Sequence, residues 1–322
     1  MNMIIQSNFP YRIVYSPIIC YTSKKKGSDN VTHILESDLL YVEINPLGAE
    51  LSRLYSKRTG REYLWQGDPN IWERQAPVLF PIVGRLKDDT YTYNGKDYTL
   101  PCHGFAPDVI FETKGPRDDT IIFTYSDNKE TRAVYPFAFK MQVIFTIRWS
   151  QVDITYHITN KTNGPMYFSC GSHEGYNCPW LEDEAFEDYF LEFDHEATYE
   201  SCTVSPDGLL MEPFYTVVEN GRVLPLDHRI FENGTSLVFI NIPTGKVSLG
   251  SHKSKERVII SYGDAPNLVV WSMPDAPYIC IEPWWGLPDF EDSDGQFISK
   301  PAIINLEKGE VFNWKHTVNI YE

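Results

Sequence analysis

The sequence has no run of about 18 uncharged apolar residues, the length that a membrane-spanning helix needs. Positive charge is scarce as well: 28 Lys and Arg residues stand against 44 Asp and Glu residues, which gives a formal net charge of -16 at pH 7. Such a balance repels phosphate backbones and anionic lipid surfaces. We therefore expect a soluble protein with no nucleic-acid partner and no membrane partner.

The chain also lacks the marks of a secreted protein. Residues 1–20 have polar and charged positions throughout, and no continuous hydrophobic segment precedes a small-residue cleavage site. None of the six cysteines belongs to a Cys-x-x-Cys pair, and a chain of 322 residues can bury a core without disulfides. These absences predict free thiols and a cytoplasmic location.

Motifs of several enzyme classes are missing too. We find no phosphate-binding loop, no dinucleotide-binding glycine motif and no serine nucleophile elbow. There is also no His-Glu-x-x-His motif and no short His-x-His pair, which would favour a metal site. These chemistries have no local signature in the sequence.

Strand-like alternation is what the sequence does have. Apolar residues occupy odd positions up to Trp149 and even positions from Val152 onward. A two-residue turn at Ser150-Gln151 explains this switch. It predicts a hairpin whose opposing pairs share one buried face: Trp149 with Val152, Ile147 with Ile154, Phe145 with Tyr156, and Val143 with Ile158.

Other segments extend the β pattern. A second hairpin is predicted at residues 90–100, where Asn94-Gly95 supplies the positive φ angles of a tight turn. The acidic run at residues 181–189 is typical of a solvated surface segment or a short helix. Further strands are expected at residues 40–44, 120–125, 236–240, 258–262, 268–271 and 312–318. Many strands with few short helices predict an all-β sandwich.

No internal repeat or composition shift marks a domain linker. We expect one domain over residues 38–322. Residues 1–37 form an N-terminal extension, with a mobile loop at Lys24 to Asn30 and with order elsewhere in the extension left open.

Three separated segments place proton-transfer groups among aromatic and turn residues. They are residues 102–106 around His103, residues 171–177 around His173, and residues 281–289 around Glu282. Two imidazoles and a carboxylate can perform general acid and base chemistry near neutral pH. The aromatic neighbours Trp284, Trp285 and Tyr176 suit a carbohydrate, because the C–H faces of sugar rings pack on aromatic rings.

Each candidate residue could also have a purely structural role. A histidine in a β protein is usually structural, and Glu282 could cap a turn beside Pro283. Arg85 could pair with one of the many acidic residues. One of Trp284 and Trp285 belongs to the core, because adjacent strand residues face opposite sides. Asp289 could cap the loop that follows it.

Five motifs in order carry a resemblance to a known family. They are Asn45 to Glu50, Pro77 to Leu86, His103 to Ala106, the His173 segment, and Cys280 to Trp284. With these motifs the chain resembles the aldose 1-epimerase (galactose mutarotase-like) family, and within it the LacX-like branch, over roughly residues 38–320. The resemblance implies a β-supersandwich fold, in agreement with the strand pattern.

The resemblance also implies an activity, the interconversion of α and β anomers of a free hexose. Glu282 would be the base on the anomeric hydroxyl and His173 the acid toward the ring oxygen, while His103 hydrogen-bonds near that oxygen. Arg85 would anchor sugar hydroxyls. No metal and no organic cofactor is needed. The remaining candidate sugar contacts are Asn177, which could orient His173 or the sugar, Trp284 and Asp289.

The chain departs from the pattern of this branch at its second histidine. Where the branch often has Gly-Gly-His-Pro, Ser172 and Glu174 flank His173. If Glu174 faces the pocket, it would raise the pKa of His173 or select a different substrate.

Several alternatives stay open at this point. A non-catalytic carbohydrate-binding protein would keep the aromatics and Arg85, and a sugar-phosphate mutarotase would need a basic cluster, of which only Arg85 and Arg74 are near the motifs. A metal-dependent enzyme could use the same histidines and Glu282. A glycoside hydrolase would need a second carboxylate facing Glu282. The sequence does not decide between a monomer and a homodimer.

Overall fold

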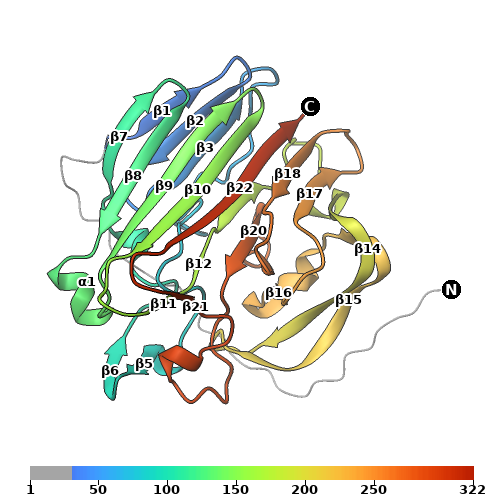
Figure 1. Cartoon of the computed structure of the whole chain (residues 1–322). Helices are drawn as coiled ribbons and strands as arrows, with labels where there is room; N and C mark the ends of the chain where they lie inside the picture. Colours follow the sequence, from blue (N-terminus) through green and yellow to red (C-terminus); the bar gives the residue numbers. More distant parts are fainter. Residues whose placement is uncertain (1–30) are drawn as a thin grey trace.

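Most of the chain forms β-strands in the computed structural model, which describes residues 31–322 (Figure 1). The helical segments are short: α1 (Lys129–Val134), η1 (Lys87–Asp89), η2 (Ala106–Asp108), η3 (Phe186–Asp188), η4 (His228–Gly234) and η5 (Phe297–Ser299). The strands are β1 (His33–Glu36), β2 (Leu40–Asn45), β3 (Glu50–Ser56), β4 (Arg61–Glu62), β5 (Thr90–Tyr93), β6 (Lys96–Thr99), β7 (Glu112–Arg117), β8 (Thr120–Ser126), β9 (Phe139–Arg148), β10 (Gln151–Asn160), β11 (Met166–Phe168), β12 (Cys170–Gly171), β13 (Glu174–Asn177), β14 (Tyr189–Val204), β15 (Leu210–Pro225), β16 (Leu237–Phe239), β17 (Lys246–Ser251), β18 (Arg257–Ser261), β19 (Asn267–Trp271), β20 (Tyr278–Trp285), β21 (Ile304–Leu306) and β22 (Val311–Tyr321).

One 14-stranded sheet organises the molecule. Its order is β12-β20-β19-β16-β14-β17-β18-β22-β10-β9-β8-β7, with β13 also pairing with β20 and β15 with β14. A four-stranded sheet, β1-β2-β3-β4, lies beside β8, β9 and β10 in Figure 1, and buried residues of the two sheets share one core. Two small sheets, β5-β6 and β11-β21, complete the fold. The predicted all-β class is confirmed.

The hairpin of β9 and β10 forms, but its predicted register is wrong. Val152 pairs with Ile147, not with Trp149, and Ile154 pairs with Phe145. The two-residue turn is Trp149-Ser150, where Trp149 has a φ of 52° and is 75% exposed. The other seven apolar side chains of the predicted face are buried. The alternation therefore predicted the face correctly and the turn one residue too late.

The other predicted strands are found. Thr90–Tyr93 pairs with Lys96–Thr99 around Asn94 and Gly95, both at positive φ. The segments predicted near residues 40, 120, 237, 258, 268 and 312 correspond to β2, β8, β16, β18, β19 and β22. The acidic run of residues 181–189 is only partly solvated, because Glu184 is buried and accepts hydrogen bonds from Tyr189 and Ser251.

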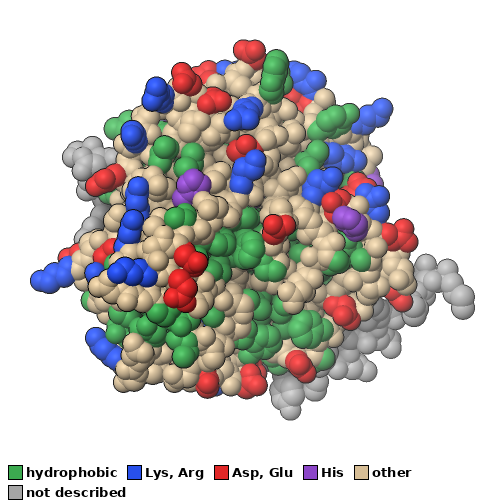
Figure 2. All heavy atoms as spheres, viewed as in Figure 1, with side chains coloured by type: hydrophobic (Ala, Val, Ile, Leu, Met, Phe, Trp, Pro, Cys, Tyr) green, Lys and Arg blue, Asp and Glu red, His purple; other side chains and the backbone are tan. Residues whose placement is uncertain are grey.

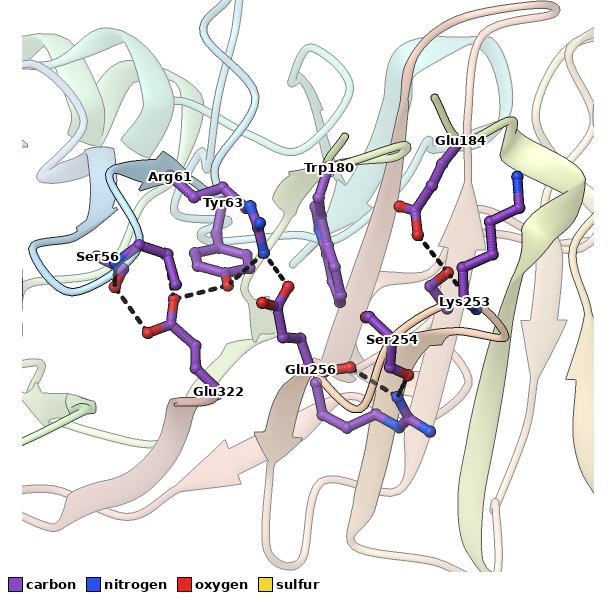
Figure 3. A network of polar contacts seen from close by, with 12 residues as sticks. Ser56, Arg61, Tyr63, Trp180, Glu184, Lys253, Ser254, Glu256 and Glu322 are labelled. Atoms are coloured by element: carbon purple, nitrogen blue, oxygen red, sulfur yellow. Dashed lines mark hydrogen bonds and ion pairs between the residues drawn. The ribbon is translucent and has the colours of Figure 1, made fainter. Parts of the chain in front are cut away.

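The four-stranded sheet is joined to the large sheet by side-chain contacts as well as by packing. Glu322, after the end of β22, accepts hydrogen bonds of 2.8 Å from Ser56 and from Tyr63 (Figure 3). Arg61 of β4 pairs with Glu256, next to β18 (Figure 3). These contacts connect the edge of the four-stranded sheet to two strands of the large sheet.

The predicted N-terminal extension is described only from residue 31. His33–Glu36 pairs with β2, so the first sheet begins before residue 38. The predicted mobile loop at Lys24 to Asn30 lies outside the described residues. In the part of the chain from residue 31 onward, the five cysteines are free thiols, and no helix has the length and apolarity needed to cross a membrane.

On the face shown in Figure 2, charged side chains of both signs are interspersed with exposed hydrophobic ones. Lys and Arg side chains are more frequent over the upper and left parts of this view, and hydrophobic side chains are grouped in its lower half.

Candidate active site

A cavity of about 910 Å³ opens over one part of the large sheet. Its floor is formed by side chains of three adjacent strands, β20, β19 and β16, and its walls by loops together with the ends of β14 and η4. The floor residues are Val238, Val269, Trp271, Glu282 and Trp284, and the wall segments include residues 69–74, 84–85, 101–103, 203–208, 232 and 234–236. The cavity contains residues from all three segments that the sequence indicated.

Strand pairing places His173 beside Glu282. β12 and β13 both pair with β20, with Gly171 opposite Trp284 and Glu174 opposite Ile281. Ser172 and His173 lie in the gap between these short strands, so the pairing leaves them next to Pro283 and Glu282. Gly171 permits this close approach, since a Cβ there would lie 2.5 Å from Cδ1 of Trp284.

Glu282 and His173 form the chemical centre of the cavity. Nε2 of His173 lies 3.3 Å from Oε2 of Glu282, and their exposed fractions are 7% and 1%. Burial, helped by the negative charge of Glu174, raises the pKa of Glu282 well above its usual value. Burial, helped by His103, lowers the pKa of His173. Both shifts have the same physical cause, because burial disfavours the charged form of each group.

His103 is held as a neutral hydrogen-bond donor. Its Nδ1 accepts a 3.0 Å hydrogen bond from the backbone N–H of Gly84, so the proton of the neutral ring resides on Nε2. Burial, and then the charge of Arg85, lower the pKa of His103 to about 4. The ring centroids of His103 and His173 are 5.2 Å apart. The left-handed backbone of His103, with a φ of 66°, helps to aim the ring into the cavity.

Two tryptophans that the sequence did not single out surround His173. Trp72 stacks on its ring at 5.1 Å, and Trp271 meets it edge-on at 5.8 Å. Both line the cavity, and Met273 lines it beside them. No local motif marks these residues, because Trp72 lies on a loop and Trp271 reaches the site only through the pairing of β19 with β20.

Arg85 and Trp284 also line the cavity, as expected. Arg85 is half-buried and pairs with Asp89 at 3.3 Å. Trp284 donates a 3.2 Å hydrogen bond from Nε1 to the carbonyl of Ser172, which helps to hold the His173 loop. Trp285 faces the other side of the sheet and packs on Phe312, so the alternation between the two tryptophans is confirmed.

Besides Trp285, three residues expected at the sugar lie outside the cavity lining. The side-chain amide of Asn177 donates hydrogen bonds of 3.0 Å to the carbonyls of Glu62 and Leu64. These bonds join β13 to the four-stranded sheet. Asp289 is 2% exposed and binds Nζ of Lys300 at 2.5 Å. Tyr176 is fully buried in the core. Their positions are structural: Asn177 and Asp289 have polar partners away from the cavity, and Tyr176 packs in the core.

Carboxylates outnumber arginines around the cavity. The six acidic lining residues are Glu73, Asp89, Asp108, Asp207, Glu232 and Glu282. The two arginines are both paired: Arg74 with Asp108, and Arg85 with Asp89. This charge distribution disfavours an anionic ligand.

One group of side chains in the described part of the chain could hold a metal ion. Donor atoms of His173, Cys280 and Glu282 all lie within 4.8 Å of one another. A nitrogen, a sulfur and a carboxylate oxygen form a donor set that zinc accepts. Burial raises the pKa of the Cys280 thiol well above its usual value, however, and metal binding requires the thiolate. With the Cys280 thiol protonated, these three side chains are poor ligands for a zinc ion.

Comparison with known proteins decides the family. The family model described as aldose 1-epimerase matches residues 32–319. The chain belongs to the aldose 1-epimerase family. Protein LacX (chromosomal) of Lactococcus lactis subsp. lactis is 32% identical over 284 residues, covering 84% of this chain and 93% of LacX.

Solved structures of similar proteins agree with the fold. A galactose mutarotase related enzyme from Lactobacillus acidophilus has a TM-score of 0.86 at 34% identity and covers 91% of this chain and 98% of its own. A galactose mutarotase-like protein from Lactobacillus casei has a TM-score of 0.85 at 28% identity, covering 90% of this chain and 100% of its own. The family resemblance and the mutarotase-like fold expected from the sequence are confirmed.

Proposed function

We propose that this protein is an aldose 1-epimerase that interconverts the α and β anomers of an uncharged free hexose. Glu282 acts as the base and His173 as the acid. The observation that carries this proposal is the 3.3 Å separation of Nε2 of His173 from Oε2 of Glu282 on the floor of a cavity. Oε2 of Glu282 is buried and has no hydrogen-bond partner among the described residues, as expected of an atom that is satisfied by substrate.

The reaction needs one proton to leave and one to arrive. The carboxylate of Glu282 removes the proton of the anomeric hydroxyl, the bond from C1 to the ring oxygen breaks, and the imidazolium of His173 protonates that oxygen. The open-chain aldehyde rotates about its C1–C2 bond. Closure on the other face of the carbonyl returns both protons and gives the other anomer, so the enzyme ends in its starting state.

Burial makes both charged groups of this cycle more reactive. An isolated carboxyl and imidazole would hold one proton on the imidazole, with ordinary pKa values about two units apart. Burial raises the pKa of Glu282 and lowers that of His173. A raised pKa makes the ionised carboxylate of Glu282 a stronger base, and a lowered pKa makes the protonated ring of His173 a stronger acid, so both shifts favour proton transfer to and from the sugar.

His103 contributes a fixed hydrogen bond in this scheme. Because its Nδ1 accepts from the N–H of Gly84, its Nε2–H is the donor that a sugar oxygen can meet. Its lowered pKa keeps the ring neutral near neutral pH. We assign it to holding the ring oxygen near His173, where charge develops as the ring opens.

The charges around the cavity favour an uncharged sugar over a sugar phosphate. Both arginines of the cavity are already paired with carboxylates, and four further carboxylates line the walls and the floor. Phosphate recognition usually relies on clustered cationic donors. A sugar-phosphate mutarotase remains the weaker alternative for this reason.

A carbohydrate-binding protein without activity is the alternative from another class. It would need the cavity and its tryptophans but not a buried carboxylate beside a buried imidazole. Such groups are costly to bury without a partner or a function. The pair therefore favours catalysis.

Polarimetry of freshly dissolved α-D-glucose and α-D-galactose tests the proposal. We expect the wild type to speed the approach to rotational equilibrium and His173→Asn to abolish most of the acceleration. Folded wild-type protein that accelerates neither sugar, while still binding one of them in calorimetry, would contradict the proposal and favour the binding function.

A further inference from the structure

The two histidines of the proposed active site are held in different ways. Nδ1 of His103 accepts a hydrogen bond from the backbone N–H of Gly84, and this bond fixes its ring. Nδ1 of His173 is a buried atom that has no hydrogen-bond partner among the described residues. A catalytic imidazole is commonly oriented by a partner on its second ring nitrogen. The orientation of His173 therefore needs another cause.

The backbone around His173 is fixed, but a fixed backbone does not fix the ring. The N–H of Ser172 donates to the carbonyl of Pro283 at 3.2 Å, and the carbonyl of Ser172 accepts a bond of 3.2 Å from Nε1 of Trp284. The last side-chain torsion of a histidine has a broad distribution, so the ring plane could still tilt. A tilt would move Nε2 of His173 away from Oε2 of Glu282, which lies 3.3 Å from it.

Three aromatic rings in the described part of the chain contact His173, and one of them lies face to face with it. The ring of Trp72 is stacked on His173 with a centroid distance of 5.1 Å and an interplanar angle of 30°. Trp271 and His103 meet the imidazole edge-on, at 81° and 85°. Stacking on a flat face limits the tilt of the imidazole plane, whereas edge contacts limit its sideways movement. Trp72 is therefore the contact that sets the plane.

Trp72 is itself held by two buried aromatic residues. Its backbone carbonyl accepts a 2.8 Å hydrogen bond from Nε1 of Trp65. Its ring stacks on that of Tyr278 with a centroid distance of 5.3 Å and an interplanar angle of 23°. Trp65 is 7% exposed and Tyr278 is fully buried. These contacts fix Trp72 without any contribution from a substrate.

The loop that carries Trp72 is also anchored at its end. Oε1 of Glu50, a buried residue of β3, accepts hydrogen bonds from the N–H groups of Gln75 and Ala76, at 2.8 and 3.0 Å. The carbonyl of Gln75 accepts a 2.8 Å bond from the N–H of Gly175 in β13. Gly175 gives the indole its place, since a Cβ there would lie 2.8 Å from Cζ3 of Trp72.

We propose that Trp72 is a positioning residue that sets the ring plane of His173 for proton transfer to the ring oxygen of the sugar. This inference rests on the proposed mutarotase function and adds to it a residue that supplies no proton. Stacking holds Nε2 of His173 toward Glu282 although Nδ1 has no partner among the described residues. A displacement of about 1 Å at a reacting group can lower a rate about 10²-fold, so loss of the stack should reduce kcat.

Polarimetry of α-D-galactose with three variants tests the inference. Trp72→Leu keeps an apolar side chain but removes the flat face, and we expect kcat to fall about tenfold or more with KM within about threefold of the wild type. Trp72→Phe keeps a flat face and should retain kcat within about threefold. The control Trp149→Leu changes a tryptophan that is 75% exposed in the turn between β9 and β10, and should leave both constants unchanged.

A substitution on the other side of the contact provides a second test. Gly175→Ala changes none of the proposed catalytic side chains, but its Cβ would force the indole of Trp72 to shift. We expect kcat to fall about fivefold or more in Gly175→Ala alone, and Gly175→Ala to lower kcat by less than about twofold when Trp72→Leu is already present. Such non-additivity is expected of residues in contact. Circular dichroism at the assay temperature checks that each variant is folded.

The outcomes distinguish the positioning role from the mutarotase function. Acceleration by the wild type, with kcat of folded Trp72→Leu within about threefold of it, would overturn the positioning role and leave the mutarotase function intact. A higher KM with unchanged kcat would overturn it in favour of a direct contact between Trp72 and the sugar. Equal losses of kcat in Trp72→Leu and Trp72→Phe would overturn the role of the flat face. No acceleration by the wild type would overturn both proposals.

Discussion

Oε1 of Glu174 lies 2.8 Å from Nε2 of His316, and both side chains are buried on the side of the sheet opposite the cavity. Glu174 is thus not a second carboxylate in the active site, although it follows His173 directly in the sequence. Its strand position opposite Ile281 turns it away from Glu282. Its negative charge nevertheless acts on Glu282 from the other side of the sheet. After burial, it is the second cause that raises the pKa of Glu282.

Replacing Glu174 should therefore change the pH dependence of the reaction. Glu174→Gln removes the negative charge but can still hydrogen-bond to His316. The pKa of Glu282 should fall, so the base stays ionised at lower pH and the acid limb of kcat/KM moves to lower pH. The matched variant Glu200→Gln alters an exposed carboxylate outside the cavity and should leave the limb in place. An acid limb that stays put or moves to higher pH in Glu174→Gln would contradict the assignment.

His103 should make the fold sensitive to acid. Its pKa is lowered to about 4 in the folded protein from an ordinary 6.5, so below pH 6.5 the unfolded chain binds more protons than the folded one. The stability that His103 contributes is present above pH 6.5 and is lost as the pH falls from there toward 4. We expect the melting temperature of His103→Asn to fall less than that of the wild type between pH 7 and pH 4.5.

Asn is the suitable replacement because it tolerates the positive φ of this position and its carbonyl can accept from Gly84. Melting temperatures that fall equally in the wild type and in His103→Asn would show that His103 does not cause the acid sensitivity.

The buried ion pair of Asp289 and Lys300 should be important for stability and for the placement of Arg85. Asp289 also accepts from the N–H of Lys87 at 3.0 Å and donates its own N–H to the carbonyl of Arg85 at 2.9 Å. Lys300→Met leaves the carboxylate buried without its cation, which typically costs about 3–5 kcal/mol. Urea denaturation should show a loss of that size, and the double variant with Asp289→Asn should recover most of it. A loss of unfolding free energy below about 1 kcal/mol in Lys300→Met would contradict the importance of this ion pair for stability.

Removal of metal ions should leave the activity unchanged. The reaction proposed for Glu282 and His173 needs no Lewis acid, and burial keeps the neighbouring Cys280 thiol protonated. We expect protein dialysed against a chelator to retain its full polarimetric rate. A rate that is lost on dialysis and restored by Zn²⁺ would instead assign the group of His173, Cys280 and Glu282 as a metal centre.

Sequence patterns predicted the strands well because alternation is a local property. They placed the turn between β9 and β10 one residue late, because Trp149 continues the apolar alternation although it occupies the turn. Hydrophobicity alone cannot distinguish a tryptophan that ends a buried face from one that begins a turn. The burial of Glu184 was missed for a related reason: its partners Tyr189 and Ser251 become neighbours only in the folded sheet.

The same limit applies to the site. Glu282, His173, His103, Arg85 and Trp284 were indicated by motifs, and all five line the cavity. Asn177 and Asp289 occur in the same motifs but serve the backbone and Lys300. Trp72 and Trp271 have no motif, since they reach the cavity through loop packing and strand order. Motifs indicate chemical groups, whereas cavity shape depends on long-range contacts.

The most direct test of the account compares Glu282→Gln with the wild type in α-D-galactose mutarotation followed by polarimetry, with Glu200→Gln as the matched surface control. We predict a fall in kcat of about 10²–10⁴-fold for Glu282→Gln, retained sugar binding in calorimetry, and a wild-type rate for Glu200→Gln. A Glu282→Gln rate within tenfold of the wild type would contradict the assignment of Glu282 as the catalytic base.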